Sequence, residues 1–528
     1  MSGGDARARL AQPLEPPPRV DDLAPRGAAR HPDAPAITAS DGVLTYREFA
    51  AAVDGAAAVL RGLGVVGGDR VLIVNENCAA ALVLALAAPR IAAWPVLVNA
   101  RLSAREIEAI AAHCTPRRML FTTAVSRDAG VHAERAGAAT LALPGVSDIA
   151  AASVDADAVA EPVPDDSACQ VAALVYTTGT TGAPKGVMLS HRNLLFAAVS
   201  GATLRRLGPD DRVYVALPIS HIFGLASGCM GSLLAGATLH LVPRFTAEGL
   251  ADALEHDGIT VLPGVPAMYT RLLEHAQRTG RAIRAPRLRF AYAGGAPLDP
   301  ALKVEAEGVL RQPLHNGYGL TETSPTISLS RIEAPRADLS VGPPVPGIEL
   351  RFVGADGRAV PRGEVGELHV RGPNVMLGYY RDAALTAQAI DREGWFNTGD
   401  LARQDGDGNL FIVGRTKELI IRSGFNVYPV EVEGVLGQHP AVAQTAVVGR
   451  TVPGNEEVVA FVELRAGAAA TPAELHAFAA AHLAPYKVPA EIVVMSALPA
   501  SATGKVLKAN LRELAQAGGE TGSRRAPG

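Results

Sequence analysis

The sequence predicts an α/β fold with two parts. The first is a large N-terminal domain of layered α/β subdomains that ends in a small β-rich subdomain, and the second is a small, mobile α/β C-terminal domain. Helix-like alanine and leucine stretches alternate with short apolar runs from about Thr45 onward, which is typical of layered α/β architecture. Glycine-punctuated short strands follow about Gly342, and the segment beyond about Lys417 carries helix and strand signals of its own.

Each part shows these signals in chain order. Short apolar runs that favour buried strands lie in the layered part: RVLIVN (70–75), RVYVALP (212–218), ATLHLVP (237–243) and GITVLPG (258–264). The segment 348–372, IELRFVGADGRAVPRGEVGELHVRG, has the turn spacing of β-hairpins. The last part holds helix-like PVEVEGVLGQHP and AELHAFAAAHL with strand-like QTAVVG and EEVVAFVEL. We therefore divide the chain into a mobile segment 1–30, a large domain 31–416, a C-terminal lid domain 417–515 and a disordered tail 516–528.

Composition excludes several classes of protein. The chain has 528 residues, of which 48% are hydrophobic and 19% charged, so there is ample material for a core. A net charge of −4 argues against nucleic acid as a partner. The longest apolar stretch, Cys78 to Pro89, is too short to cross a bilayer, and the opening MSGGDARARLAQPLEPPPR lacks a leader pattern. The four cysteines form no CxxC pair, which suits a reducing cytoplasm.

One segment, LVYTTGTTGAPKGVMLSH (174–191), is rich in hydroxyls and glycine around Lys185 and follows an apolar strand-like run. Glycine lets backbone N–H groups approach an oxyanion, threonine hydroxyls add donors, and lysine adds a mobile positive charge. The spacing is not that of a Walker A loop, because Pro184 precedes the lysine and Gly186 follows it. The segment therefore indicates phosphate binding, with a flexible surface linker as the alternative from local composition alone.

Five further motifs accompany this segment along the chain. They are YAGGAPL (292–298), NGYGLTETSP (316–325), GELHVRGPNVMLGYY (366–380), the run GWFNTGDLARQDGDGNLFIVGRTKELIIRSGFNVYPVEVE (394–433) and LPASATGK (498–505). Together they resemble the adenylate-forming superfamily of acyl-CoA synthetases, luciferases and peptide-synthetase adenylation domains. The resemblance runs from about Thr45 to Lys508 in the family's order and approximate spacing. It implies an ATP-dependent carboxylate–CoA ligase that makes acyl-AMP and pyrophosphate, and then transfers the acyl group to coenzyme A.

The resemblance assigns the nucleotide site residue by residue. Glu322 is expected to hold Mg²⁺ together with Thr177, and Thr321 to contact the α-phosphate, although a lone glutamate is more often a solvated charge. Asp400 is expected to accept hydrogen bonds from both ribose hydroxyls, assisted by Arg415. The phosphate-binding residues are Thr177, Thr178, Gly179, Thr180, Thr181, Gly182 and Lys185. The adenosine-binding residues are Gly294, Gly295, Ala296, Asn316, Gly317, Gly319 and Tyr318, with the tyrosine lying against adenine.

Within the long motif, DGDGN (405–409) also invites comparison with a calcium-binding loop. That comparison fails, because Leu410 stands where the tight-turn glycine belongs and Thr416 replaces the closing glutamate. We expect a hairpin turn there.

Lys505 is the expected catalytic lysine of the C-terminal domain. By resemblance it reaches the α-phosphate and the substrate carboxylate during adenylation, where an ammonium offsets growing negative charge. Lys417 matches the hinge about which the small domain turns after adenylation. That turn presents Ser423, Gly424 and Phe425 to the pantetheine arm of coenzyme A, and Gly424 lets the arm pass close to the backbone.

The segment LPISHIFGLASG (217–228) corresponds to the acyl pocket. No acid lies at positions 222–225 to pair with a substrate ammonium, so we expect an uncharged acyl tail. His221 is expected at the channel between the acyl and thiol sites, with a packed histidine as the alternative. Two small residues, Ser227 and Gly319, suggest room for a fatty chain or an aromatic ring. The expected pocket wall is Phe223, Ser227, Gly319, Pro325 and Thr326.

Several functional alternatives stay open. We favour a medium- or long-chain fatty acid, but an aryl acid of coumarate or benzoate type or a malonyl-type acid fits the same motifs. An acyl-AMP ligase that loads a carrier protein is the main rival for the acceptor, and luciferase-type oxidation is a further one. A nucleotide-binding scaffold without activity would have lost its catalytic residues, yet all six key ones are present: Thr177, Lys185, Glu322, Asp400, Arg415 and Lys505. The motifs say nothing on whether the chain forms a homodimer.

Overall fold

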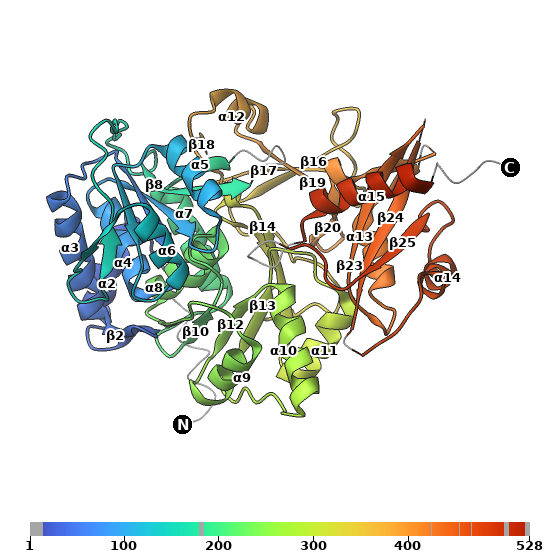
Figure 1. Cartoon of the computed structure of the whole chain (residues 1–528), viewed down its shortest axis with the longest axis horizontal. Coiled ribbons are helices and arrows are strands. Elements are labelled where there is room, and N and C mark those ends of the chain that lie inside the picture. The colour runs from blue at the N-terminus through green and yellow to red at the C-terminus, as the bar shows by residue number, and fades with distance from the viewer. Residues whose placement is uncertain are drawn as a thin grey trace.

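The computed structural model describes residues 14–178, 184–423, 425–453, 455–465, 467–500 and 506–522. Figure 1 shows two bodies: the chain up to about residue 415 forms the larger, and the last part forms a smaller body to one side, with its own sheet and helices. The mixed α/β class and the small C-terminal body predicted from the sequence are both confirmed.

Two sheets and the helices between them make up most of the larger body. The eight-stranded sheet has the order β15-β14-β13-β12-β10-β11-β1-β2, and the five-stranded sheet has the order β4-β3-β5-β7-β6. The strands of the eight-stranded sheet are β1 (Pro35–Ala39), β2 (Gly42–Thr45), β10 (Arg212–Val215), β11 (Thr238–Leu241), β12 (Val261–Gly264), β13 (Phe290–Ala293), β14 (Leu314–Gly319) and β15 (Thr326–Leu329). Those of the five-stranded sheet are β3 (Arg70–Asn75), β4 (Trp94–Asn99), β5 (Arg118–Phe121), β6 (Ala139–Leu141) and β7 (Ile149–Ala151).

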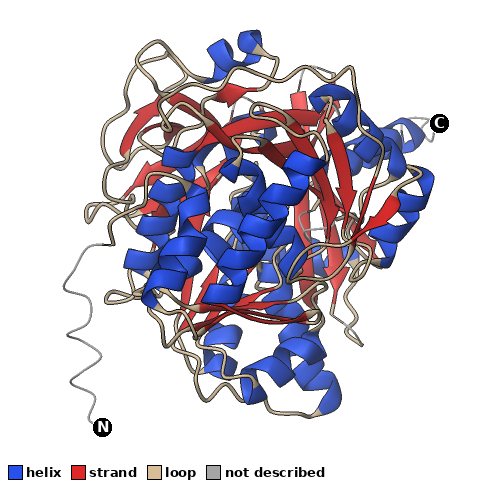
Figure 2. Ribbon diagram, turned by 90° about the vertical axis from the view of Figure 1, so that its left-hand side faces the viewer, coloured by secondary structure: helices blue, strands red, loops and turns tan. Residues whose placement is uncertain are grey.

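The largest hydrophobic cluster combines strands of both sheets with the helices packed against them. Figure 2 shows this group of helices lying across the strands. The apolar stretch near Cys78 forms one of these helices, α4, and all but its last residue are buried, so its apolarity reflects a place in the core. The helices of the larger body are α2 (Leu23–Arg30), α3 (Tyr46–Gly62), α4 (Ala79–Arg90), α5 (Ala104–Cys114), α6 (Arg127–Arg135), α7 (His191–Leu204), α8 (Gly231–Ala235), α9 (Ala247–His256), α10 (Pro266–Thr279), α11 (Pro300–Leu310) and α12 (Ala383–Ala389), with the π-helical segment η2 (Phe223–Met230).

Local sequence explains where several helices begin. Thr45, Ser103 and Ser190 each cap a helix through a capping box with the residue three positions later, which satisfies backbone N–H groups that a helix leaves unpaired. The first helix differs from expectation. Residues 20–30, assigned above to a mobile end, form the 3₁₀ turn η1 (Val20–Asp22) and α2, and Val20 and Leu23 are buried in the main core.

Two antiparallel sheets complete the larger body. The hairpin β8 (Val171–Thr178) and β9 (Pro184–Ser190) pairs with β18 (Gly378–Tyr379). The predicted β-rich subdomain is a four-stranded sheet of order β16-β17-β19-β20, formed by β16 (Glu349–Val353), β17 (Gly366–Arg371), β19 (Phe396–Gln404) and β20 (Leu410–Arg415). The DGDGN segment connects β19 to β20 as a hairpin turn, closed by a hydrogen bond between the Asp405 amide and the Asn409 carbonyl.

The smaller body begins after the 3₁₀ turn η4 (Thr416–Glu418). Its elements are β21 (Ile420–Arg422), β22 (Phe425–Val427), α13 (Pro429–Leu436), β23 (Val442–Val452), β24 (Asn455–Leu464), α14 (Pro472–His482), β25 (Glu491–Met495) and α15 (Lys508–Gly522). Its two hydrophobic clusters, as far as the structure describes them, contain no residue before Ile420. Helix α15 continues past residue 516, where the disordered tail was expected to begin.

No helix in the described ranges is both long and apolar enough to cross a membrane.

Candidate active site

The strand ends on either side of the predicted phosphate-binding loop are paired. Thr177 lies opposite Lys185 and Thr178 opposite Pro184 at the end of the β8–β9 hairpin. The loop residues Gly179, Thr180, Thr181 and Gly182 lie outside the described residues. The Lys185 ammonium lies over the ring of Tyr379, with its nitrogen 5.6 Å from the ring centroid.

Tyr379 also contacts the predicted metal-binding residue. Its hydroxyl donates a hydrogen bond to Glu322 Oε1 at 2.9 Å, and burial together with the Glu322 charge raises the pKa of this tyrosine. Tyr379 therefore bridges Lys185 and Glu322, which come from motifs far apart in the sequence. Glu322 is held in the 3₁₀ turn η3 (Thr321–Thr323), whose Thr323 hydroxyl donates to the Pro325 carbonyl. The sequence analysis quoted Tyr379 within a motif but gave it no role.

The donors around Glu322 fit a magnesium ion that is held jointly with phosphate. In the described ranges, no group of three or more His, Cys, Asp and Glu side chains gathers into a metal site. Mg²⁺ does not need such a cage, because it is usually bound by one or two carboxylates, substrate phosphates and water. One partly exposed carboxylate beside a phosphate-binding hairpin matches that pattern.

The predicted ribose site lies where the eight-stranded and four-stranded sheets meet. Asp400 and Arg415 are cross-strand neighbours on β19 and β20, and the Arg415 guanidinium contacts the Asp400 carboxylate, with Nε 2.8 Å from Oδ1. The Tyr318 hydroxyl, from β14, donates to Asp400 Oδ2 at 2.5 Å. Burial and the Asp400 charge raise the pKa of Tyr318, so its hydroxyl stays protonated as a donor.

Phe223 and three glycines meet at the edge of this site. A side chain at Gly294 would lie 3.3 Å from the Phe223 ring and 3.5 Å from the Gly317 carbonyl oxygen. Gly295 is exposed and has a φ of +80°, a conformation that favours glycine. The predicted adenosine-binding residues from β13 and β14 are therefore next to one another, and Phe223 from η2 packs against them.

Gly319, expected in the acyl pocket wall, lies against the protein's own backbone. Gly319 was expected to leave room for the substrate, but an added side chain there would meet the Pro325 carbonyl oxygen at 1.7 Å. The space beside Gly319 is filled by the protein's own backbone, because β14 and β15 turn back on each other and Gly319 pairs with Thr326. Gly319, Pro325 and Thr326 do lie together as predicted, while Ser227 is buried within η2.

His221 lies two residues before η2, at the end of a loop that Asn77 holds in place. The Asn77 side chain donates to the carbonyls of Val215 and Leu217 and accepts from the Ile219 amide. Burial lowers the pKa of His221 to about 4, and the charge of Arg101 contributes to this shift. His221 is therefore neutral at physiological pH. Asn77 could not be found from the sequence, because it carries no motif signal.

The predicted coenzyme A segment is an exposed hairpin, β21–β22. The Ser423 amide donates a hydrogen bond to Asn455 Oδ1 at 2.6 Å. Phe425 is 54% exposed, and its ring stacks on the ring of Tyr486 with the centroids 4.7 Å apart. Gly424 lies outside the described residues. An exposed aromatic ring beside a polar turn presents a surface on which a pantetheine arm can lie.

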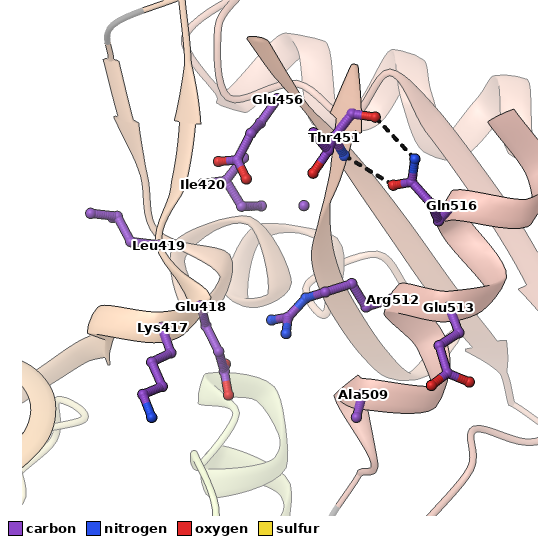
Figure 3. Close-up of a pocket in the computed structure, with 11 residues that line it drawn as sticks. Lys417, Glu418, Leu419, Ile420, Thr451, Glu456, Ala509, Arg512, Glu513 and Gln516 are labelled. Carbon is purple, nitrogen blue, oxygen red and sulfur yellow. Dashed lines mark hydrogen bonds between the residues drawn. The ribbon is translucent and has the colours of Figure 1, made fainter. Parts of the chain in front are cut away.

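The predicted hinge residue Lys417 is exposed and lines a cavity of about 400 Å³ between η4 and α15 (Figure 3). Polar and charged side chains dominate its lining, among them Glu456, Arg512 and Glu513, and Gln516 exchanges two hydrogen bonds with the Thr451 backbone. Among the predicted site residues that the structure describes, no other lines this cavity. The cavity therefore lies beside the predicted hinge residue and apart from the other predicted site residues in the described ranges.

Lys505 lies outside the described residues, but both ends of its segment are described. Ala500 and Val506 form an antiparallel bridge, and the Leu507 amide donates to the Pro499 carbonyl. Lys508, at the start of α15, is paired with Glu418 at 2.9 Å and with Glu433 at 2.8 Å. Lys508, three residues after Lys505, is thereby tied to η4 and α13, a connection that no motif indicates.

Comparisons with known proteins agree with this geometry. The family profile described as "AMP-binding enzyme" matches residues 25–380, and "AMP-binding enzyme C-terminal domain" matches residues 431–505. The indoleacetate–CoA ligase of Aromatoleum aromaticum is 35% identical over 500 residues, covering 93% of this chain and 96% of the relative. A long-chain-fatty-acid–CoA ligase of Yersinia pestis is 37% identical over 355 residues, which cover 66% of this chain and 62% of the relative. The ATP-bound structure of MatB from Rhodopseudomonas palustris is 31% identical in sequence and has a TM-score of 0.80. The match covers 94% of this chain and 99% of the MatB chain.

An adenylate-forming α/β enzyme with a small C-terminal domain is thus the class that the fold and the motifs define. The chain belongs to the AMP-binding enzyme family, as an AMP-forming acid–thiol ligase of the acyl-CoA synthetase type.

Proposed function

We propose that this chain activates a carboxylic acid with ATP as acyl-AMP, releases pyrophosphate, and then transfers the acyl group to coenzyme A. The observation that carries the proposal is the row Lys185–Tyr379–Glu322. It places a cation, a hydroxyl donor and a carboxylate side by side at the end of the β8–β9 hairpin. Such a row suits the triphosphate of ATP, because the cation and a carboxylate-held metal ion address the crowded negative charge from two sides.

The nucleotide's other end fits the Asp400 network. Each oxygen of a carboxylate can accept two hydrogen bonds, so Asp400 can bind ribose hydroxyls while it keeps Tyr318 and Arg415. Tyr318 and the backbone at Gly294 to Ala296 then enclose adenine. Glu322, with Thr177, is the proposed holder of Mg²⁺, which when bound neutralises phosphate charge. Thr321 and His221 complete the proposed catalytic residues, together with Lys505.

For the acid itself, we propose a medium- or long-chain fatty acid. The segment after His221 offers no acid to a substrate ammonium. The proposed pocket wall consists of Phe223, Ser227, Pro325 and Thr326. Gly319 lies beside this wall, where its missing side chain lets the Pro325 carbonyl approach. An aryl acid is the second candidate. It is favoured by the Phe223 ring, which can stack on a planar substrate, and by the indoleacetate–CoA ligase among the relatives.

Coenzyme A is the proposed acceptor, approached through Ser423, Gly424 and Phe425. We place the boundary between the two domains at Lys417, because the hydrophobic clusters described beyond it are separate from those before it. Rotation about this hinge would exchange the segment of Lys505 for the β21–β22 hairpin. A carrier protein is the alternative acceptor.

The experiment is a product assay with ATP, Mg²⁺, coenzyme A and a panel of fatty, aryl and dicarboxylic acids. We expect AMP and the acyl-CoA ester to appear in equal amounts, and only when a suitable acid is present. Formation of ADP, or nucleotide turnover that is independent of the acid, would refute the proposal. AMP without a coenzyme A ester, restored to a thioester by a carrier protein, would assign the acceptor differently.

A further inference from the structure

A buried arginine lies directly behind the proposed acyl wall. Arg205 follows the last residue of α7, is 2% exposed, and lies over the Tyr292 ring with Cζ 4.2 Å from the centroid. Its Nη1 donates to the Ser227 carbonyl at 2.9 Å, which ties it to the η2 segment. The Tyr292 ring in turn packs on Phe223, with centroids 5.7 Å apart. Arg205 and Tyr292 therefore reach the same segment that Phe223 and Ser227 present to the acyl tail.

The guanidinium is incompletely satisfied. It carries five N–H donors, but the described part of the chain provides one hydrogen bond, from Nη1, and no carboxylate within salt-bridge distance. Nε is buried and has no partner among the residues that the structure describes. Buried charges are normally paired, because desolvation otherwise costs several kcal/mol.

A second buried arginine shows how this chain satisfies such a group when its role is structural. Arg70, on β3, is 0% exposed and donates to the carbonyls of Gly68, Cys114 and Thr115, and also to the Thr115 hydroxyl. Four hydrogen bonds therefore hold the Arg70 guanidinium in place. Arg205 lacks this arrangement, so packing alone does not account for its charge.

Tyr292 adds a second donor at the same place. It is 2% exposed; its backbone carbonyl accepts a hydrogen bond from Tyr269, and no hydrogen bond of its hydroxyl is found in the described ranges. Buried tyrosine hydroxyls usually find a partner. Helix α7 makes room for the Arg205 side chain at Gly201. A side chain at this position would begin only 3.1 Å from Arg205 Nη1.

We propose that the acid activated by this enzyme carries an oxygen acceptor at the far end of its apolar tail, and that Arg205 and Tyr292 bind that acceptor. The proposal rests on the acyl-CoA synthetase function above and specifies its substrate class. A second carboxylate would pair with the guanidinium through two parallel hydrogen bonds, and a carbonyl would accept one from each residue. The absence of an acid at positions 222–225 argues only against a cationic tail, so it does not oppose an anionic or neutral acceptor.

The test compares three series of straight-chain acids of equal carbon number, from short to long: monocarboxylic acids, α,ω-dicarboxylic acids, and acids with a keto group next to the terminal carbon. Acid-dependent AMP release gives kcat/KM for each. We expect a member of an acceptor-bearing series to be the best substrate, by roughly a hundredfold over the monocarboxylic acid of the same length. Preference for the dicarboxylic series assigns a carboxylate, and preference for the keto series assigns a carbonyl.

Variants separate recognition of the tail from folding. Arg205→Met should lower kcat/KM for the preferred acid by roughly a hundredfold, and should change kcat/KM for the monocarboxylic acid of the same length by less than about threefold. Tyr292→Phe should lower kcat/KM for the preferred acid by roughly tenfold. Arg206→Met is the matched control, since the neighbouring arginine is 42% exposed in its side chain and contacts Glu333 instead. Its substrate preference should equal that of the wild type.

Two results would overturn the inference. One is a wild-type enzyme that prefers the plain acid at every length. The other is an equal loss for all three series in folded Arg205→Met or, should that variant not fold, in Tyr292→Phe. In both cases the ligase function would stand, because AMP would still form. If no acid in any series led to AMP, the proposed function would fall and the inference with it.

Discussion

Individual residues in this site are connected through side chains that the motifs do not mark as functional. Tyr379 is the clearest example, because it touches both Lys185 and Glu322. Its ring contributes through cation–π attraction and its hydroxyl through a hydrogen bond to a carboxylate, so the two contributions can be separated by removing the hydroxyl alone.

Tyr379→Phe should lower the rate of acid-dependent pyrophosphate exchange by roughly tenfold, since a hydrogen bond to a charged group is worth about 1.5–3 kcal/mol. The ring remains below Lys185, so binding of ATP measured by calorimetry should change less than the exchange rate. Tyr380→Phe is the matched control, because the neighbouring hydroxyl donates to Glu161 and not to Glu322. Equal rates for the two variants would remove the proposed role of Tyr379.

For single residues, the sequence indicated which side chains lie near one another more clearly than it indicated what surrounds each of them. Asp400 and Arg415, both assigned to the ribose, are in contact, and Tyr318, assigned to adenine, donates a hydrogen bond to Asp400, because strand pairing and the sheet junction fix their positions. The contact beside Gly319 could not be predicted, because a small residue shows that something approaches closely but not whether it is a substrate or the Pro325 carbonyl. Arg205 was missed for a similar reason: an arginine after a helix is usually exposed, and only the fold buries this one.

Among the elements, α7 connects the phosphate-binding hairpin to the N-terminal segment. It begins at His191, directly after β9, and the His191 Nδ1 atom accepts a hydrogen bond from the Val20 amide of η1 at 3.1 Å. Burial lowers the pKa of His191 to about 3, with Arg19 contributing. A protonated His191 cannot accept this hydrogen bond, so acid should loosen the contact between η1 and α7.

The sign of the pH dependence follows from that shift. An unfolded chain binds a proton at this histidine below about pH 6.5, whereas the folded chain does not until about pH 3. Stability should therefore fall as the pH is lowered from 6.5 to 4.5, by up to about 1.4 kcal/mol per pH unit from His191 alone. His191→Asn should flatten this slope in urea unfolding followed at several pH values. The control is His256→Asn, because the His256 side chain is 66% exposed; this variant should keep the wild-type slope. A wild-type slope in His191→Asn would contradict the proposed role of His191.

Element types were predicted from periodicity and turns with few errors, but element ends and π-helical geometry were not. The segment η2 reads as an ordinary apolar run, and its π form depends on tertiary contacts: Gly224 packs so closely on the 217–218 backbone that a side chain would lie 2.3 Å from the Pro218 carbonyl. Residues 20–30 were assigned to a mobile end, yet Val20, Leu23 and Ala24 enter the main core.

In the whole molecule, a small body with its own core is joined to a large one through η4. Glu418 in η4 pairs with Lys508 in α15, and Arg465 contacts Glu305 of the larger body at 3.4 Å. The pairing of Lys508 with Glu418 joins α15 to the turn that holds the proposed hinge residue Lys417, and a cavity of about 400 Å³ lies beside that turn. This arrangement supports the proposal that one lysine enters the active site for adenylation and withdraws for thioester formation.

The two half-reactions of Lys505→Ala test this proposal most directly. Acid-dependent pyrophosphate exchange should fall by at least about a hundredfold, because the ammonium offsets charge that develops in the adenylation transition state. Thioester formation from pre-formed acyl-AMP and coenzyme A should stay within about threefold of the wild type, because the lysine is absent from that step. Equal losses in both half-reactions would contradict a lysine that serves only the first and a domain that moves between them.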